Sequence, residues 1–93
     1  MRLVIADDHD LMRRGVRDLL SNFAEWEIVG EASQGEDALQ RINQLQPDVA
    51  ILDFSMPGMN GAEVAQAVAM TAPSTRIIIL TMHDSDATLR QIV

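Results

Sequence analysis

The chain has 93 residues, with 14 acidic and seven basic side chains, a formal net charge of −7 and no cysteine. An acidic surface repels nucleic acid and anionic membranes, so we expect this segment to contact neither directly. The absence of cysteine excludes disulfide scaffolds, thiolate metal sites and thiol catalysis. No apolar run approaches the ~20 residues of a membrane span, and the first residues lack a signal-peptide pattern, so a cytoplasmic location is expected.

Four short apolar runs predict the strands of the fold. They occupy residues 3–6, 28–32, 49–52 and 77–80. Most of them are continuously apolar instead of alternating with polar residues, which is typical of strands that are covered on both faces. We therefore expect a sheet with helices packed against it.

Apolar residues recur at helical spacing in the segments between these runs. The three predicted apolar faces comprise Met12, Val16, Leu19, Leu20 and Phe23, then Ala38, Leu39, Ile42 and Leu45, then Val64, Ala65, Val68 and Ala69. Residues 33–36 have the pattern of a capping box, and residues 60–63 have a weaker version of it. Pro47 and Pro73 follow the second and third helices, as prolines commonly do. A fourth helix is predicted from about Ser85 to the end of the chain.

The predicted elements alternate strictly between strand and helix. Such alternation indicates parallel strands joined by right-handed crossovers. No internal repeat, linker or low-complexity tract interrupts residues 1–93. The sequence therefore predicts a single α/β domain over residues 1–93.

Acidic residues follow two of the predicted strands. Asp7 and Asp8 follow the first strand, Asp53 the third, and Thr81 lies at the end of the fourth. A lone aspartate in such a place is commonly a turn former or a helix cap. Together, however, these side chains should meet at the carboxyl edge of the sheet, where ligands bind in such folds. Because neighbouring carboxylates resist ionisation without a cation, we expect a divalent ion, and oxygen ligands favour Mg²⁺ or Mn²⁺.

Three segments resemble the receiver domain of two-component response regulators, and the resemblance extends over residues 1–93. They read VIADDHDLMRRGVRDLL, DVAILDFSMPGMNG and IIILTMHD. The second is the most specific, while the first and third look most like receivers that precede a C-terminal LuxR/FixJ-type helix-turn-helix output domain. The resemblance implies a flavodoxin-like, doubly wound parallel sheet. It also implies a phosphoacceptor regulator, not an enzyme, with a sensor histidine kinase as partner and transcription as the process controlled.

The resemblance also implies a role for each matching residue. Asp53 matches the phosphoacceptor and a metal ligand. Asp8 matches the direct ligand of the ion, and Asp7 the acid that holds it through water. The backbone carbonyl of Ser55 would complete the metal shell. Thr81 matches the switch hydroxyl that bonds the new phosphoryl group.

The family also has a fifth strand, which carries a lysine that contacts the phosphoryl group, and a last helix. Both would lie beyond residue 93, so only about four βα units are expected here. The chain contains no lysine, and Arg90 is a poor substitute because it presents a planar fork from the last predicted helix. We therefore expect phosphorylation to be slow or absent, although Mg²⁺ can still bind. The fourth strand, residues 76–80, would form an open edge, which favours a homo-oligomer such as a dimer.

Two other functions remain open. One is a Mg²⁺-dependent phosphatase with an aspartyl nucleophile. Such enzymes usually have a lysine, which this chain lacks, and a second acid two residues after the nucleophile, where this chain has Ser55. A non-catalytic oligomerisation or binding fragment is the other. His9 is interpreted as a loop residue near the acidic pocket. Arg13, Arg14 and Arg17 are interpreted as a solvated helix face.

Overall fold

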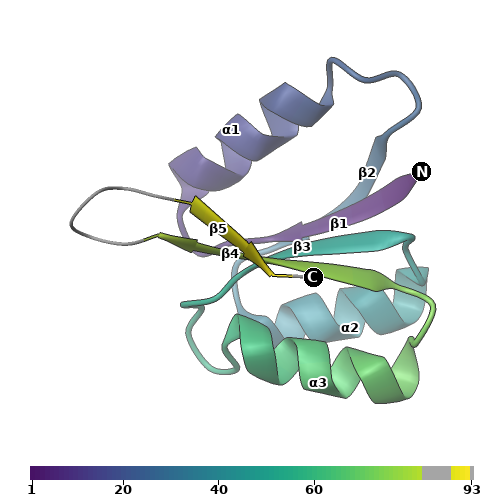
Figure 1. Ribbon diagram of the computed structural model, residues 1–93, viewed down its shortest axis with the longest axis vertical. Helices are drawn as coiled ribbons and strands as arrows, with labels where there is room; N and C mark the ends of the chain where they lie inside the picture. The colour runs from purple at the N-terminus through teal and green to yellow at the C-terminus, as the bar shows by residue number, and fades with distance from the viewer. Residues whose placement is uncertain (83–88, 93) are drawn as a thin grey trace.

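Five strands lie side by side in one sheet, in the order β2-β1-β3-β4-β5 (Figure 1). The computed structural model describes residues 1–82 and 89–92, with residues 81, 82 and 89–92 described as strand backbone. The strands are β1 (Arg2–Ala6), β2 (Glu27–Ala32), β3 (Val49–Asp53), β4 (Arg76–Met82) and β5 (Leu89–Ile92). The helices are α1 (Asp10–Leu20), α2 (Gly35–Leu45) and α3 (Gly61–Thr71). In the part of the chain that the structure describes, no helix is long and apolar enough to cross a membrane.

The first four strands are parallel, as predicted. β1 lies between β2 and β3, and β4 follows β3. This order is the flavodoxin-like arrangement, in which the chain reverses direction across the sheet between β1 and β3. The predicted fold class is therefore confirmed. β1, β2 and β3 each extend the predicted run by one residue, and β4 extends it by three.

Helices cover both faces of the sheet, α1 on one side and α2 with α3 on the other (Figure 1). The core under α2 and α3 includes the fully buried Ala38, Ile42 and Val64, which belong to the predicted apolar faces. The core under α1 is smaller, and Leu20 is the buried residue that the helix contributes to it. Leu19 was expected on the same face, but its side chain is 62% exposed.

The two predicted capping boxes differ from expectation, because the one expected to be weaker, at residues 60–63, is the one that forms. At α3 the capping box is complete, because the Asn60 side chain accepts from the Glu63 N–H and the Glu63 side chain accepts from the Asn60 N–H. At α2 the predicted box over residues 33–36 is wrong, since the helix begins after Gln34 without a side-chain cap. Glu36 instead accepts a hydrogen bond from the Met59 N–H at 3.1 Å. The acid thereby links α2 to the loop between β3 and α3.

The prediction of a fourth helix is wrong for residues 89–92, which form β5. This strand pairs antiparallel with β4, with Ile79 opposite Ile92 and Met82 opposite Leu89. The outer backbone groups of β4 need hydrogen-bond partners, and a returning strand supplies them where a helix would not. The edge that was expected to be open is thus covered at residues 79–82. The predicted helix start near Ser85 lies outside the described residues.

Candidate metal centre

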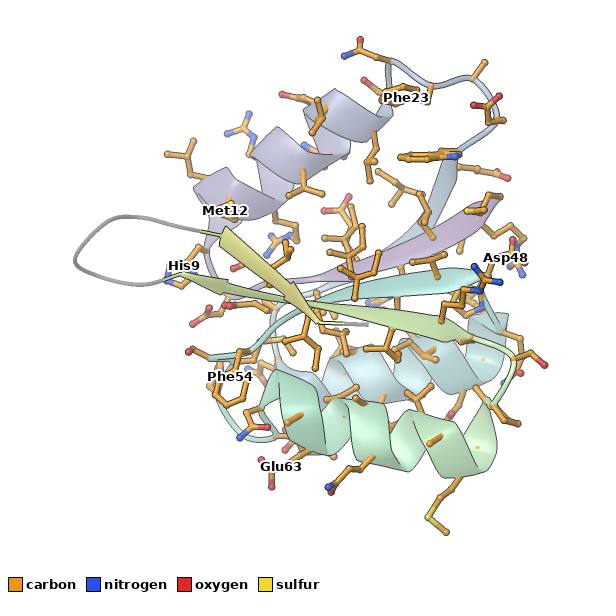
Figure 2. The ribbon with its side chains drawn as sticks, viewed as in Figure 1. His9, Met12, Phe23, Asp48, Phe54 and Glu63 are labelled. Carbon is orange, nitrogen blue, oxygen red and sulfur yellow. The ribbon has the colours of Figure 1, made fainter. Side chains whose placement is uncertain are left out.

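Two neighbouring strands end beside each other and bring the predicted acids together. Ala6 pairs with Leu52 in the register of β1 and β3, so Asp7 and Asp53, the next residues along each strand, are neighbours at the same edge. In Figure 2, His9 and Phe54 lie at this end of the sheet and Asp48 lies at the opposite end. One ligand atom from each of four residues lies within 4.8 Å of the others; the residues are Asp7, Asp8, His9 and Asp53.

Asp7 is the most buried acid of the cluster, with 5% of its surface exposed. Its backbone N–H donates to the Ala32 carbonyl at 3.0 Å, which extends the contact between β1 and β2 by one residue. Its carboxylate accepts from the His9 N–H at 2.8 Å, so the chain turns sharply after the strand. This turn points the neighbouring Asp8 into the same space, with its side chain 32% exposed.

Asp53 carries the clearest sign of a missing partner. Its side chain is 15% exposed, and Oδ2 is buried without a hydrogen-bond donor among the residues that the structure describes. Oδ1 has only a long contact, 3.4 Å, with the Ser55 N–H. Burial, and next the charge of Asp7, raise the pKa of Asp53 above its ordinary value. A cation at this position would satisfy the oxygen and stabilise the charge.

The His9 ring lies among these carboxylates. Its Nδ1 is 3.0 Å from an oxygen of Asp7, 3.0 Å from an oxygen of Asp8 and 3.6 Å from Asp53 Oδ2. The hydrogen bond to Asp7, and next the charge of Asp8, raise the pKa of His9 above its ordinary value. A protonated ring at this position would offset part of the negative charge of the three acids. His9 is near the pocket, as expected, but in contact with all three acids.

The donor set fits a hard divalent cation. Three carboxylates and a backbone carbonyl are oxygen ligands of the kind that Mg²⁺ and Mn²⁺ prefer. The unpartnered oxygen of Asp53 faces two further carboxylates within ion-binding distance of one another. Asp7, Asp8 and Asp53 could hold the ion, together with the carbonyl of Ser55. Which of these groups bind directly stays a prediction.

Close packing fixes the loop after Asp53. A Cβ atom on Gly61 would lie 2.8 Å from the Asp53 carbonyl oxygen, so only glycine lets α3 begin this close to the strand. Gly58 has a φ of +75°, which favours glycine, and lies against the carboxylate of Glu36. Met56 is buried in the core below the loop. The loop thus holds Ser55 in place beside Asp53.

Thr81 follows the residue that pairs with Asp53. Leu80 is opposite Asp53 in the register, and its carbonyl accepts from the Phe54 N–H at 3.0 Å. The backbone of Thr81 therefore lies next along β4 at the same edge of the sheet. Its side chain lies outside the described part of the structure, and so does His83. The role expected of the Thr81 hydroxyl stays a prediction.

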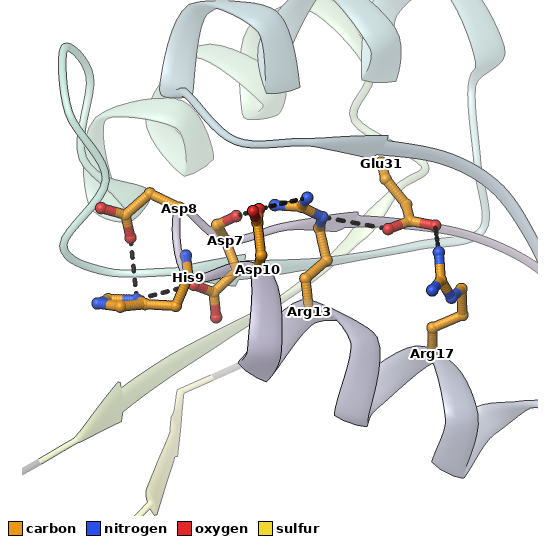
Figure 3. Close-up of polar contacts among 7 residues, drawn as sticks. All are labelled: Asp7, Asp8, His9, Asp10, Arg13, Arg17 and Glu31. Atoms are coloured by element: carbon orange, nitrogen blue, oxygen red, sulfur yellow. Dashed lines mark hydrogen bonds and ion pairs between the residues drawn. The ribbon is translucent and has the colours of Figure 1, made fainter.

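Arg13 lies in an environment that its sequence pattern did not indicate. It was assigned to a solvated helix face, yet its side chain is only 19% exposed. The guanidinium donates to the Asp7 carbonyl, to the Asp10 carboxylate and to the Glu31 carboxylate (Figure 3). An arginine five residues after the second acid of the cluster, one helical turn into α1, is the signal that could have indicated this contact.

Comparisons with known proteins identify the family of the chain. The sequence model of the response regulator receiver domain family matches residues 3–93. The chain is 45% identical over 91 residues to a protein named "Probable transcriptional regulatory protein NarL" from Mycobacterium tuberculosis, covering 98% of the chain and 42% of that relative. The chain therefore spans about two fifths of the length of this relative.

Solved structures are similar as well. The signal receiver domain of NarL from Mycobacterium tuberculosis matches 92% of the chain and 69% of that structure, with 46% identity and a TM-score of 0.85. The isolated REC domain of RcsB from Salmonella enterica serovar Typhimurium, solved in the presence of the phosphomimetic BeF₃⁻, matches 94% of the chain and 65% of that structure. Its identity is 32% and its TM-score is 0.83.

Proposed function

Because the chain belongs to the response regulator receiver domain family, we propose that it is a phosphoacceptor module and that Asp53 receives the phosphoryl group. The observation that carries this proposal is the buried Oδ2 of Asp53, which has no hydrogen-bond donor among the described residues and lies beside two further carboxylates. No hydrogen bond within this part of the chain would have to break at Oδ2 for the carboxylate to bind a cation and accept a phosphoryl group. Burial and the charge of Asp7 raise the pKa of Asp53, and a bound cation would stabilise the charged form of this carboxyl group.

The proposed reaction is a phosphoryl transfer from a phosphohistidine. An oxygen of Asp53 attacks phosphorus, the P–O bond forms, the P–N bond breaks, and its electron pair returns to the leaving imidazole. Asp8 and Asp53 would hold Mg²⁺ directly, together with the carbonyl of Ser55, and Asp7 would act through a water molecule. When bound, the ion neutralises charge on the transferring oxygens. The residues of the chain contribute by holding these oxygens in position.

The partners follow from the same proposal. The phosphoryl donor is a sensor histidine kinase, and the location is cytoplasmic. In the longer protein, Thr81 bonds the new phosphoryl group and the change is passed to a DNA-binding output domain that regulates transcription. The family membership makes the aspartyl phosphatase the weaker alternative, because Ser55 stands where such enzymes usually have a second acid. Association of two chains stays a prediction.

A phosphorylation assay tests the proposal. The chain is incubated with Mg²⁺ and a small acyl phosphate, and its intact mass is followed over time. We expect slow addition of one phosphoryl group, because the chain has no lysine, and its removal by hydroxylamine, which cleaves acyl phosphates. Asp53→Asn should abolish the addition. Asp18→Asn, which removes an exposed acid from α1, should leave it unchanged.

Beryllofluoride provides an equilibrium measurement that does not depend on the transfer rate. With Mg²⁺ present, we expect it to shift the amide NMR signals of the residues around Asp53 in the wild-type chain and not in Asp53→Asn. Phosphorylation that persists in Asp53→Asn, or neither addition nor beryllofluoride binding in the wild type, would contradict the proposed role.

A further inference from the structure

The guanidinium of Arg13 joins the end of β1, the first turn of α1 and the strand β2. Nη1 donates to the backbone carbonyl of Asp7 at 2.7 Å, at the end of β1. Nη2 donates to the carboxylate of Asp10 at 2.8 Å, in the first turn of α1. Nε donates to the carboxylate of Glu31 at 3.2 Å, on β2. All three nitrogens of the planar group are therefore in use, each with a different acceptor.

Glu31 accepts hydrogen bonds from two arginines, Arg13 and Arg17. Its other carboxylate oxygen accepts from Nη1 of Arg17 at 3.1 Å (Figure 3). Arg17 lies on α1 one turn after Arg13, so the two arginines hold Glu31 between them. Glu31 is 26% exposed and Arg17 is 45% exposed, so the network is partly shielded from water. Partial shielding strengthens such ion pairs relative to those on an open surface.

The contact with Asp7 is made to the backbone and leaves the metal-facing atoms untouched. The carbonyl that Arg13 binds belongs to the peptide between Asp7 and Asp8. Fixing this peptide fixes the direction in which both side chains leave the backbone. On the far side of the same residue, the Asp7 N–H donates to Ala32. The peptide groups on both sides of Asp7 are thus anchored.

We propose that Arg13 is a positioning residue of the metal centre, which orients Asp7 and Asp8 through the Asp7 carbonyl while anchored on Glu31. This inference rests on the proposed function, because it assigns the residue that prepares the acids for Mg²⁺. The planar fork of arginine offers donors on three separate nitrogens, whereas the donors of lysine all lie on one compact ammonium nitrogen. The acids would then lie in binding geometry before the ion arrives, which reduces the entropy lost on binding.

The charge of Arg13 and its positioning role predict opposite changes in Mg²⁺ affinity when the side chain is removed. A cation beside the centre repels Mg²⁺, so its removal would tighten Mg²⁺ binding if charge alone mattered. Loss of positioning would instead weaken binding. Groups that orient metal ligands typically change metal affinity by about 10–100-fold when they are removed. Arg13→Ala should therefore weaken Mg²⁺ binding, against the electrostatic expectation.

Calorimetric Mg²⁺ titration of five chains measures this effect: the wild type, Arg13→Ala, Arg13→Lys, Glu31→Gln and Arg14→Ala. We expect Arg13→Ala and Arg13→Lys to weaken binding about tenfold or more, although the lysine keeps the charge. Glu31→Gln should weaken it less, because the amide keeps one acceptor. Arg14 is exposed on the same helix, so Arg14→Ala removes an equal charge and should change the affinity less than about twofold. Circular dichroism shows which variants are folded, and only those are compared. If Arg13 merely stabilised the fold, the folded variants would bind Mg²⁺ with the affinity of the wild type.

Amide NMR spectra of the metal-free chains provide a second measurement, which does not require Mg²⁺. Arg13→Lys should shift the signals of Asp8 and His9, whereas Arg14→Ala should not. If Arg13→Lys bound Mg²⁺ as well as the wild type, or if Arg13→Ala bound it more tightly, the positioning role would be overturned. If the wild type bound no Mg²⁺ but Arg13→Lys still moved these signals, the proposed function would fail while the structural role of Arg13 stood.

Discussion

Replacement of Asp53 by asparagine should stabilise the metal-free chain at neutral pH. The wild-type fold holds a carboxylate whose Oδ2 is buried without a donor among the described residues and whose neighbour Asp7 is also an acid. An unsatisfied buried polar group costs about 1–3 kcal/mol, and more when it is charged. Asparagine keeps the shape and removes the charge, so we expect a gain of about 1–2 kcal/mol. For a chain of this length, the gain corresponds to a rise in Tm of roughly 4–16 °C.

The stability gained by Asp53→Asn should depend on pH. Because the pKa of Asp53 is raised in the folded chain, the folded state binds the proton more tightly than the unfolded state. The stability contributed by this group is present below its ordinary pKa of 3.8 and is lost as pH rises through the folded pKa. The advantage of Asp53→Asn should therefore be largest at neutral pH and disappear near pH 3.8.

Thermal unfolding in the presence of a chelator measures this difference, with Asp18→Asn as the control. Both variants remove one negative charge, so a general relief of the net charge would affect them equally. We expect Asp18→Asn to change the stability by less than about 0.5 kcal/mol. Saturating Mg²⁺ should stabilise the wild type more than Asp53→Asn, because the ion binds the folded state. Equal Tm values for the wild type and Asp53→Asn at neutral pH would refute the reasoning.

Three further predictions concern the surroundings of the site. The pKa of His9 should lie above its ordinary 6.5 in the metal-free chain and fall when Mg²⁺ binds, because the ion neutralises the acids that hold the proton. NMR titration of the ring measures both pKa values, and a pKa that Mg²⁺ leaves unchanged would contradict the shared site. Gly35→Ala should destabilise the fold by more than about 2 kcal/mol, because its Cβ would lie 2.0 Å from the Met59 carbonyl oxygen. Gly15→Ala, with open space around it, should instead stabilise α1 by up to about 1 kcal/mol. Denaturant unfolding measures the free energy of unfolding of both variants. Asn60→Ala should cost about 1 kcal/mol by removing the capping box of α3, and a loss below about 0.3 kcal/mol would show that the cap is dispensable.

The sheet and the acidic cluster could be predicted because they depend on local and general rules. Continuous apolar runs identified the four parallel strands, and the topology of such sheets places the carboxyl ends of β1 and β3 side by side. Asp7 and Asp53 therefore meet although 45 residues separate them in the chain. No side-chain detail was needed for that step.

Interactions between distant segments could not be predicted in the same way. Arg13 has the spacing of an exposed helical residue, and only the fold shows that β2 brings Glu31 within its reach. The acid of the expected capping box, Glu36, bonds Met59 instead, because the β3–α3 loop lies against the start of α2. Residues 89–92 have no strong helical or strand pattern, so the free edge of β4 decided their structure.

The central claim is that one divalent ion is shared by the carboxylates that follow β1 and β3. A crystal soaked in Mn²⁺ tests it most directly, because the anomalous signal locates the ion independently of the protein atoms. We expect one strong peak bonded to oxygens of Asp8 and Asp53 and to the carbonyl of Ser55, with Asp7 behind a water molecule. No peak among these oxygens at saturating Mn²⁺, or a peak bonded elsewhere in the chain, would contradict it.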